Sequence, residues 1–251
     1  FVIFGWLSDK VGRKPIILLG CLLAALTYFP LFQALTTAAN PALARATATS
    51  PITVYADPAD CNVQFDPIGK TVFNHSCDLA KSYLAKAGVT YTNVAAPAGT
   101  VAEVRIGDQV VIPSFRGDAM APADFAAQKK TWDKSLGEAL TAAGYPAKAD
   151  SALVNKPMVV LILFILGFYV TMVYGPIAAA LVEMFPTNIR YTSMSLPYHI
   201  GNGWFGGFLP TTAFAIVAAT GNIYSGLWYP IVVALGTVVL GFLLVKEGKD
   251  V

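Results

Sequence analysis

The chain has 251 residues, of which 55% are hydrophobic and 13% are charged, and its formal net charge is +2. This composition is typical of a membrane protein and excludes an ordinary soluble domain of this length. No basic face is concentrated anywhere, so nucleic-acid binding is not expected. The charges are unevenly spread, because residues 36–156 hold eleven Lys or Arg and eleven Asp or Glu. A polar segment therefore interrupts an apolar chain.

The chain begins with an apolar run, residues 1–7, which we interpret as the last turns of a helix. We expect Phe1 to be an internal residue of a longer protein. A polar turn is predicted over residues 5–15, with the sequence GWLSDKVGRKP. Residues 15–35 are then apolar almost without interruption, and a helix of this length covers roughly 31 Å, the hydrocarbon thickness of a bilayer. The polar turn therefore marks a membrane surface.

The residue types in this turn suit a conformational latch. Gly5 and Gly12 permit close helix approach and a tight turn. A carboxylate and a guanidinium at a helix junction, here Asp9 and Arg13 with Lys14 beside them, pair with each other and with helix ends. A simpler interpretation is a cytoplasmic loop with the usual excess of cations. The spacing Gly-x-x-x-Asp-x-x-Gly-Arg-Lys resembles the signature loop of the major facilitator superfamily, a large group of secondary transporters.

Residues 36–156 are predicted to form a separate small domain of the α/β or α+β class. Residues 38–51, rich in Ala, Thr and Pro, are interpreted as a flexible exit from the membrane. The expected elements are a strand over 52–55, a helix over 78–86 that Gly88 ends, a hairpin over 101–113 around Gly107-Asp108, and a helix over 122–143.

The cysteines point to the compartment of this segment. Cys61 and Cys77 both lie in it, with fifteen residues between them, whereas Cys21 lies in an apolar run. A disulfide between Cys61 and Cys77 is the favoured interpretation in an oxidising compartment. The alternative is a metal site that recruits His75, but three ligands without a clear fourth argue against it, and no metal is expected.

Three further apolar runs are long enough to cross a bilayer, at residues 157–182, 192–219 and 225–245. If every run spans, the cations that flank them lie on one side. These cations are Lys10, Arg13, Lys14, Arg190, Lys246 and Lys249. By the positive-inside rule that side is the cytoplasm, so residues 36–156 are expected to be extracytoplasmic and the chain to be a multi-pass protein of the cell inner (plasma) membrane.

A second loop makes the resemblance more specific. The run Glu183-x-Phe185-Pro186-Thr187-x-x-Arg190-Tyr191-Thr192 is similar to the loop between the tenth and eleventh helices in the metabolite:proton symporter branch of the superfamily. Glu183 and Arg190 are candidates for a second charge latch. The resemblance covers about half of the chain and leaves residues 36–156 unmatched.

The resemblance implies where this chain lies in the fold of the family, a bundle of membrane helices. The signature loop occurs after helix two and, in a weaker copy, after helix eight, because the two halves are repeats. We favour the second copy, so the chain holds the end of helix eight and helices nine to twelve. The predicted divisions are 1–35, 36–156 as an insertion, and 157–251. The N-terminal half of the same protein would be missing.

The same placement implies that the tenth and eleventh helices line a central pathway. Their polar side chains are candidates for the substrate or proton pathway: Tyr169, Tyr174, Tyr198, His199 and Asn202. A hydrogen-bonding strip inside a membrane normally faces protein or a water-filled cavity. His199 titrates near neutral pH when unperturbed, so it is a candidate for proton coupling; the alternative is that its neutral form hydrogen-bonds a neighbouring helix.

The expected function is that of a secondary active transporter that moves a small polar metabolite, such as an organic acid, betaine or amino acid, with protons by alternating access. The expected partners are this substrate, protons and the lipid bilayer. An enzyme is disfavoured, because residues 36–156 contain no phosphate loop, nucleophile elbow or metal set, and no cofactor is expected. The alternative is a membrane-anchored sensor or ligand-binding protein that uses residues 36–156.

Overall fold

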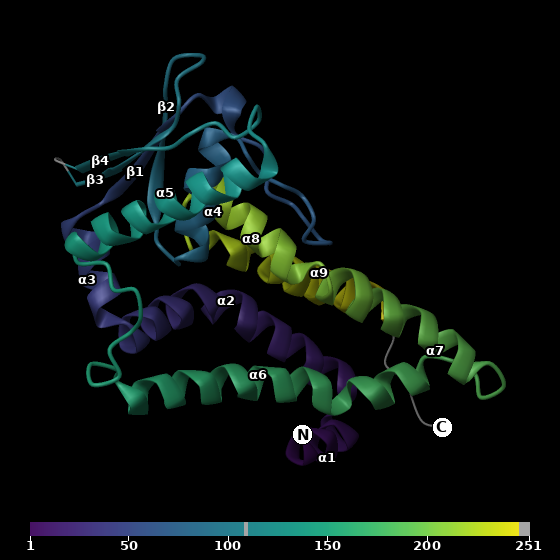
Figure 1. The fold of residues 1–251 in the computed structure, drawn as a ribbon. Coiled ribbons are helices and arrows are strands. Elements are labelled where there is room, and N and C mark those ends of the chain that lie inside the picture. Colours follow the sequence, from purple (N-terminus) through teal and green to yellow (C-terminus); the bar gives the residue numbers. More distant parts are fainter. Residues whose placement is uncertain (108–109, 246–251) are drawn as a thin grey trace. The chain divides into compact units, whose positions relative to one another are not determined.

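The computed structural model describes residues 1–107 and 110–245, and most of these residues are helical (Figure 1). The chain divides into two compact units. The helical unit comprises Phe1–Leu35, Pro157–Pro210 and Leu227–Val251. The sheet unit comprises Thr36–Lys156 together with Thr211–Gly226. The predicted boundaries at 36 and 156 stay predictions of domain organisation, and residues 211–226 join the sheet unit through contacts that the sequence does not indicate.

Among the described residues, four helical stretches are long and apolar enough to cross a membrane: Arg13–Ala39, Lys156–Glu183, Arg190–Thr220 and Ser225–Leu244. These coincide with the four predicted spans. The elements are α1 (Val2–Val11), α2 (Arg13–Ala39), α6 (Lys156–Glu183), α7 (Arg190–His199), the π-helix η2 (Ile200–Gly206), α8 (Leu209–Thr220), the 3-10 turn η3 (Ser225–Leu227) and α9 (Trp228–Leu244). The chain therefore includes membrane-spanning helices.

The predicted polar turn over residues 5–15 is wrong in its extent. Helix α1 runs on to Val11, and α2 begins at Arg13, so Gly12 alone separates them. Gly12 has a φ of 99°, which is the left-handed region that favours glycine. The helix continues because Ser8 is buried and its hydroxyl donates to the Gly5 carbonyl at 2.6 Å, so the polar residues there do not break it.

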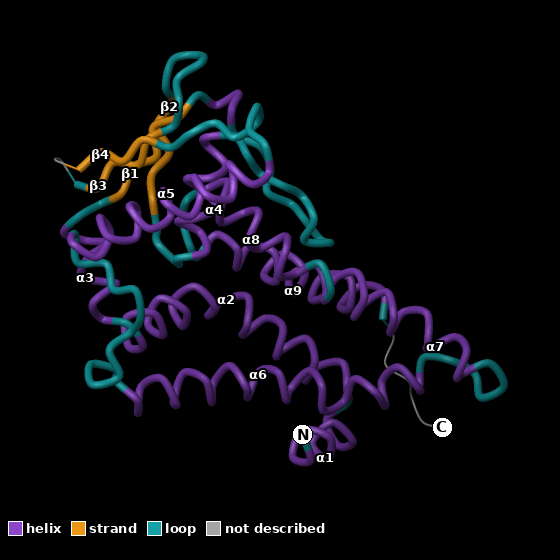
Figure 2. The backbone as a smooth tube through the Cα atoms, in the orientation of Figure 1, coloured by secondary structure: helices purple, strands orange, loops and turns teal. Residues whose placement is uncertain are grey.

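The strands form a sheet of order β2-β1-β3-β4, drawn in orange in Figure 2. They are β1 (Ile52–Ala56), β2 (Tyr91–Ala95), β3 (Glu103–Ile106) and β4 (Val110–Pro113). Strand β1 pairs in parallel with β2 and antiparallel with β3, which forms the predicted hairpin with β4. Asp108, assigned to the hairpin turn from the sequence, lies outside the described residues.

Two helices cover one face of the sheet and close a core. Helix α4 (Ser76–Lys86) and helix α5 (Pro122–Ala142) match the predicted helices to within two residues. The Tyr83 and Trp132 rings meet edge to face with centroids 5.9 Å apart, so α4 and α5 pack side by side. The core is made by Ile52, Val54, Leu84, Val104 and Leu136, each at most 2% exposed. The small 3-10 turn η1 (Pro58–Asp60) leads from β1 into the loop before α4.

The flexible exit predicted over residues 38–51 is wrong. Helix α2 runs to Ala39, and α3 (Pro41–Thr49) follows almost at once. Asn40 caps α3, since its side-chain oxygen accepts from the Leu43 N–H at 3.1 Å, and Pro41 occupies the first helical position. The Asn-Pro pair is therefore a helix start here, and the Ala-rich composition favours helix as readily as a linker.

Candidate functional site

The guanidinium of Arg13 joins the start of α2 to the end of α6. Its Nε donates to Oε2 of Glu183 at 2.6 Å, and its Nη2 lies 2.5 Å from Oε1 of the same carboxylate. This fork is the strong, directional form of an arginine–carboxylate pair. Asp9, one turn back on α1, lies 3.4 Å from Nη1 of Arg13. One cation therefore links two spans that are far apart in sequence.

Lys14 links the same place to α9. Its Nζ donates to the carbonyl oxygens of Phe242 at 3.0 Å and Val245 at 2.7 Å. The last carbonyls of a helix have no partner within the helix, and a cation there also matches the negative end of the helix dipole. Arg13 and Lys14, adjacent in sequence, thus hold the ends of α6 and α9 against α2. We call Asp9, Arg13, Lys14 and Glu183 the latch cluster.

The expectation of a second, separate latch differs from the structure. Glu183 pairs with Arg13, whereas the Nε of Arg190 donates to the Phe185 carbonyl at 3.1 Å. Arg190 therefore closes the turn between α6 and α7 instead of meeting Glu183. Sequence separation favoured the near arginine, but the start of α2 packs beside the end of α6. Lys246 and Lys249, used for orientation, lie outside the described residues.

Close helix approach occurs at glycines that the sequence argument did not single out for it. A Cβ placed on Gly20 would lie 3.0 Å from the Cβ of Met172, and one on Gly175 would lie 3.2 Å from the Cβ of Phe4. By contrast, a Cβ on Gly5 would meet nothing within 4 Å. Gly20 and Gly175 therefore let α6 approach α2 and α1. Pro176 is buried inside the continuous α6.

A cleft of about 610 Å³ adjoins the latch cluster within the helical unit. Arg13, Lys14 and Glu183 form its polar side. Ile17, Leu18, Ile177, Leu181 and Leu244 belong to its apolar side. The cleft places the latch cluster at a boundary between apolar and polar surfaces, as expected for charged groups at the end of membrane spans.

The two candidate pathway residues on α6 lie in different surroundings. The Tyr169 hydroxyl lies 3.2 Å from Oγ1 of Thr27 on α2, so it ties two helices together. Tyr169 also packs against the cluster of Phe4, Ile16 and Met172. Tyr174 is 54% exposed. The structure does not bring these two tyrosines to one surface.

Tyr198, His199 and Asn202 lie together where α7 passes into the π-helix η2. The Asn202 amide donates to the Tyr198 carbonyl at 3.0 Å, and Nδ1 of His199 lies 2.7 Å from the Ser195 carbonyl oxygen. A carbonyl only accepts, so Nδ1 of His199 is the donor in this contact. All three side chains are exposed in this chain. Local π-helical geometry is frequent at functional sites.

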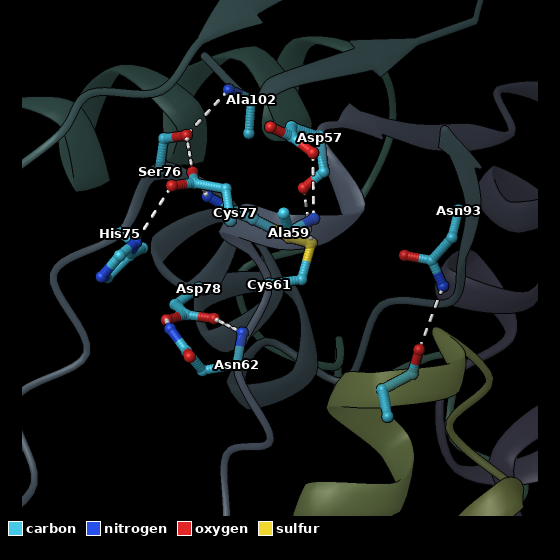
Figure 3. The surroundings of a disulfide bond; sticks show 12 residues. Asp57, Ala59, Cys61, Asn62, His75, Ser76, Cys77, Asp78, Asn93 and Ala102 are labelled. Atoms are coloured by element: carbon cyan, nitrogen blue, oxygen red, sulfur yellow. Dashed lines mark hydrogen bonds and ion pairs between the residues drawn. A yellow bond between two sulfur atoms is a disulfide. The ribbon is translucent and has the colours of Figure 1, made fainter. Parts of the chain in front are cut away.

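The sheet unit contains the predicted disulfide between Cys61 and Cys77 (Figure 3). The alternative, a metal site with Cys61, His75 and Cys77 as ligands, is therefore excluded, because the two sulfurs are bonded to each other. Cys77 lies in the first turn of α4 and is fully buried, while Cys61 lies on the loop that follows β1. The bond pins this loop to the helix and to the core of the sheet unit.

A carboxylate network surrounds the start of α4 (Figure 3). Asp60 accepts from the Ser76 hydroxyl at 2.5 Å and from His75 Nδ1 at 3.0 Å. Its burial, which would raise its pKa, is outweighed by the hydrogen bonds from Ser76, His75 and the Cys77 N–H, so the pKa of Asp60 is lowered. The hydrogen bond to Asp60 raises the pKa of His75. The network is satisfied internally and caps α4.

Comparison with known proteins finds similarity to transporters. Residues 137–250 match the family described as Sugar (and other) transporter. A protein of Staphylococcus haemolyticus named as a proline/betaine transporter is 32% identical over 91 residues, which is 36% of this chain and 19% of that protein. A relative of the same name in Staphylococcus aureus is 31% identical over 88 residues, 35% of this chain and 18% of that protein.

A citrate-proton symporter of Klebsiella pneumoniae is 34% identical over 84 residues, 32% of this chain and 19% of that protein. The matched stretch thus spans less than a fifth of the length of these relatives. No solved structure matches the chain. The names point to a transporter and not to an enzyme. The family match, the named relatives and the four spans together support the resemblance of this chain to transporters of the major facilitator superfamily.

Proposed function

We propose that the complete protein is a secondary active transporter that carries a small polar metabolite together with protons by alternating access. The observation that carries the proposal is the latch cluster, in which Arg13 forks onto Glu183 across two spans. Such a cluster stabilises one arrangement of helix ends, and a transporter must break and remake that arrangement in each cycle. The names of the relatives support an organic acid, betaine or amino acid as the class of substrate.

His199 is the proposed proton carrier in this half. Its Nδ1 donates to the Ser195 carbonyl at 2.7 Å, which fixes the orientation of the ring on the helix. Tyr198 and Asn202 supply neighbouring hydrogen-bonding groups on the same helix, and Tyr169 and Tyr174 are proposed to serve the pathway from α6. The exposure of α7 and η2 fits a surface that further helices of such a transporter, or the bilayer, would cover.

We place the protein in the cell inner (plasma) membrane, with residues 36–156 as an inserted extracytoplasmic α+β domain. Two observations support this placement. Residues 211–226, which comprise the last part of the third span and the turn after it, belong to the same compact unit as residues 36–156, as the alternation of the spans requires. The Cys61–Cys77 disulfide fits an oxidising compartment.

The test is uptake of labelled organic acids, betaine and amino acids by cells that express the complete gene, with and without a protonophore. We expect uptake of one class that collapses with the proton gradient. The next variant is His199→Gln, with Tyr191→Phe as an exposed control outside the pathway set. Uptake that persists without the gradient would refute proton coupling. No uptake of any compound by a surface-expressed protein would refute transport and favour the sensor alternative.

A further inference from the structure

The end of the third span is bound by the edge of the sheet. The Tyr91 hydroxyl donates to the Ala218 carbonyl at 2.7 Å, and the Tyr91 N–H donates to the Gly221 carbonyl at 2.8 Å. The Asn93 amide donates to the Ala219 carbonyl at 3.2 Å. Three carbonyls in and just beyond the last turn of α8 are therefore satisfied by the first residues of β2. We call Tyr91, Asn93, Ala218, Ala219 and Gly221 the strand–helix contact.

The contact is tightly packed. Tyr91 is 3% exposed and Ala218 is 1% exposed. Gly221 ends α8 with a φ of 80°, and its N–H donates to the Val217 carbonyl at 2.8 Å, so it is a left-handed helix cap. Any side chain at Gly221 would run into the Tyr91 backbone and ring. Burial raises the pKa of Tyr91, which keeps its hydroxyl a donor.

The same sheet is also tied to the ends of two other spans. Strand β1 lies beside β2, with Ile52 opposite Tyr91, and its chain runs back through α3 to the end of α2. The Tyr145 hydroxyl donates to the Ser50 carbonyl at 2.8 Å, which holds the segment after α5 to that connection. The Asn155 N–H donates to the Ala38 carbonyl at 2.9 Å, where the chain leaves for α6. The end of α2, the start of α6 and the end of α8 thus belong to one compact unit.

We propose that the sheet unit is a brace that holds the end of α8 to the end of α2 and the start of α6, so that these three helix termini move as one body. A peripheral domain on a flexible tether would leave the last carbonyls of α8 to water. Here they bond to a strand whose sheet is closed by a buried core and a disulfide. The part of this proposal that concerns transport rests on the proposed function, because it states which segments stay together during the cycle.

The first test reads the brace without transport. Hydrogen exchange of residues 216–221 is measured in the complete protein in lipid nanodiscs. Tyr91→Phe removes one hydrogen bond and keeps the ring, so exchange there should speed up about fivefold. Asn93→Ala should act in the same direction. The control is Tyr55→Phe, on the neighbouring strand, where the ring lies under Arg105 instead of α8. Exchange that is the same in all variants would overturn the brace.

The second test asks whether the contact opens during transport. Asn93→Cys and Ala219→Cys are combined in a Cys21→Ser background and bridged with a short bifunctional maleimide. We expect efficient bridging and an unchanged uptake rate, because both sides move together. A bridge that stops uptake, or that never forms, would overturn the brace. If the unbridged parent shows no uptake, the proposed function fails, while exchange and bridging still decide whether the brace exists.

Discussion

The core of the sheet unit and the α7–η2 segment bury their side chains to very different extents. In the sheet unit, Leu84 and Leu136 are fully buried, and Trp132 donates from its ring N–H to the Pro113 carbonyl at 2.8 Å. In α7 and η2, both of which are described in full, no residue is buried, and Tyr191 is 84% exposed. The first region completes its core within this chain, whereas the second presents side chains for something else to cover.

This difference in burial reflects the different surroundings of a water-soluble core and a membrane-spanning helix. A water-soluble core must be assembled from its own strands and helices, because apolar side chains left in water are unfavourable. A spanning helix satisfies its backbone internally, and lipid tails cover its apolar side chains as well as protein does. The exposed surface of α7 and η2 is therefore a meeting surface for lipid or for further protein, and not a sign of poor packing.

The largest expected effect comes from a matched pair of leucines. Leu84→Ala should destabilise the sheet unit by about 2–5 kcal/mol, because it opens a cavity in a closed core. Leu196→Ala on α7, where the side chain is 67% exposed, should change stability by less than about 0.5 kcal/mol. Pulse proteolysis of the complete protein measures both. Equal costs would mean that protein outside this chain buries Leu196, and the comparison would then have to be redrawn.

Loss of the disulfide should give the second-largest effect on stability. Replacing Cys61 and Cys77 together by Ala is expected to cost about 3 kcal/mol, because the fifteen-residue loop between them regains its freedom in the unfolded chain. Proteolytic cleavage should begin within residues 62–76, while the spans stay protected. The wild-type protein treated with reductant is the control. A double variant as resistant as the oxidised parent would contradict a stabilising role.

The latch cluster gives an effect on rate instead of stability. Arg13→Ala should lower the maximal uptake rate about tenfold. The free energy by which a latch couples helix ends typically corresponds to a factor of this order. Substrate affinity should change little. Asp9→Asn should act in the same direction and more weakly, because Asp9 contacts Arg13 only at 3.4 Å. Lys10→Ala, which removes a cation stacked on Trp6, is the control.

A double-mutant cycle sharpens this prediction. Glu183→Gln should lower the rate in the same direction as Arg13→Ala, and the combined variant should be no slower than Arg13→Ala alone, because Arg13→Ala already removes the Arg13–Glu183 interaction. Additive losses would show that Arg13 and Glu183 act apart. Unchanged uptake with normal surface expression would remove the latch cluster from the mechanism altogether.

The smallest expected effect is a pH dependence at the start of α4. The hydrogen bond to Asp60 raises the pKa of His75 in the folded state, so this pair stabilises the sheet unit fully below the ordinary pKa of about 6.5. The contribution is lost as pH rises through the higher folded-state pKa. It is small, because the His75 side chain is 42% exposed. Hydrogen exchange of α4 between pH 6 and 9 measures it, and His75→Gln should flatten the profile.

Several elements were predictable because their signals are local. The spans follow from apolar runs of sufficient length, and α4, α5 and the β3–β4 hairpin follow from periodicity and from the glycines that end them. Strand β2 was not predicted, because its side chains do not alternate between polar and apolar. In the structure it buries a single residue, Tyr91. Helix α3 was taken for a linker, since Ala, Thr and Pro suit both states.

The candidate site divides in the same way. The spacing of Asp9, Arg13 and Lys14 identifies them in the sequence. Cys61 and Cys77 are identified as a pair because both lie in the polar segment, whereas Cys21 lies in an apolar run. The partner of Arg13 was not identified, because Glu183 lies 170 residues away and the nearer Arg190 matched its charge equally well. The roles of Tyr198, His199 and Asn202 in a pathway stay predictions.

The membrane-spanning character of the chain, the placement of its polar segment between spans, and the residues of its charged loops can be read from the amino-acid sequence alone. These follow from transfer of side chains between water and lipid, which depends on composition and run length alone. The tertiary structure decided which charges pair, that Gly20 and Gly175 set the close approaches, and that Tyr91 holds the end of α8. These contacts join residues distant in sequence, and only packing in three dimensions selects one such partner among many of equal chemistry.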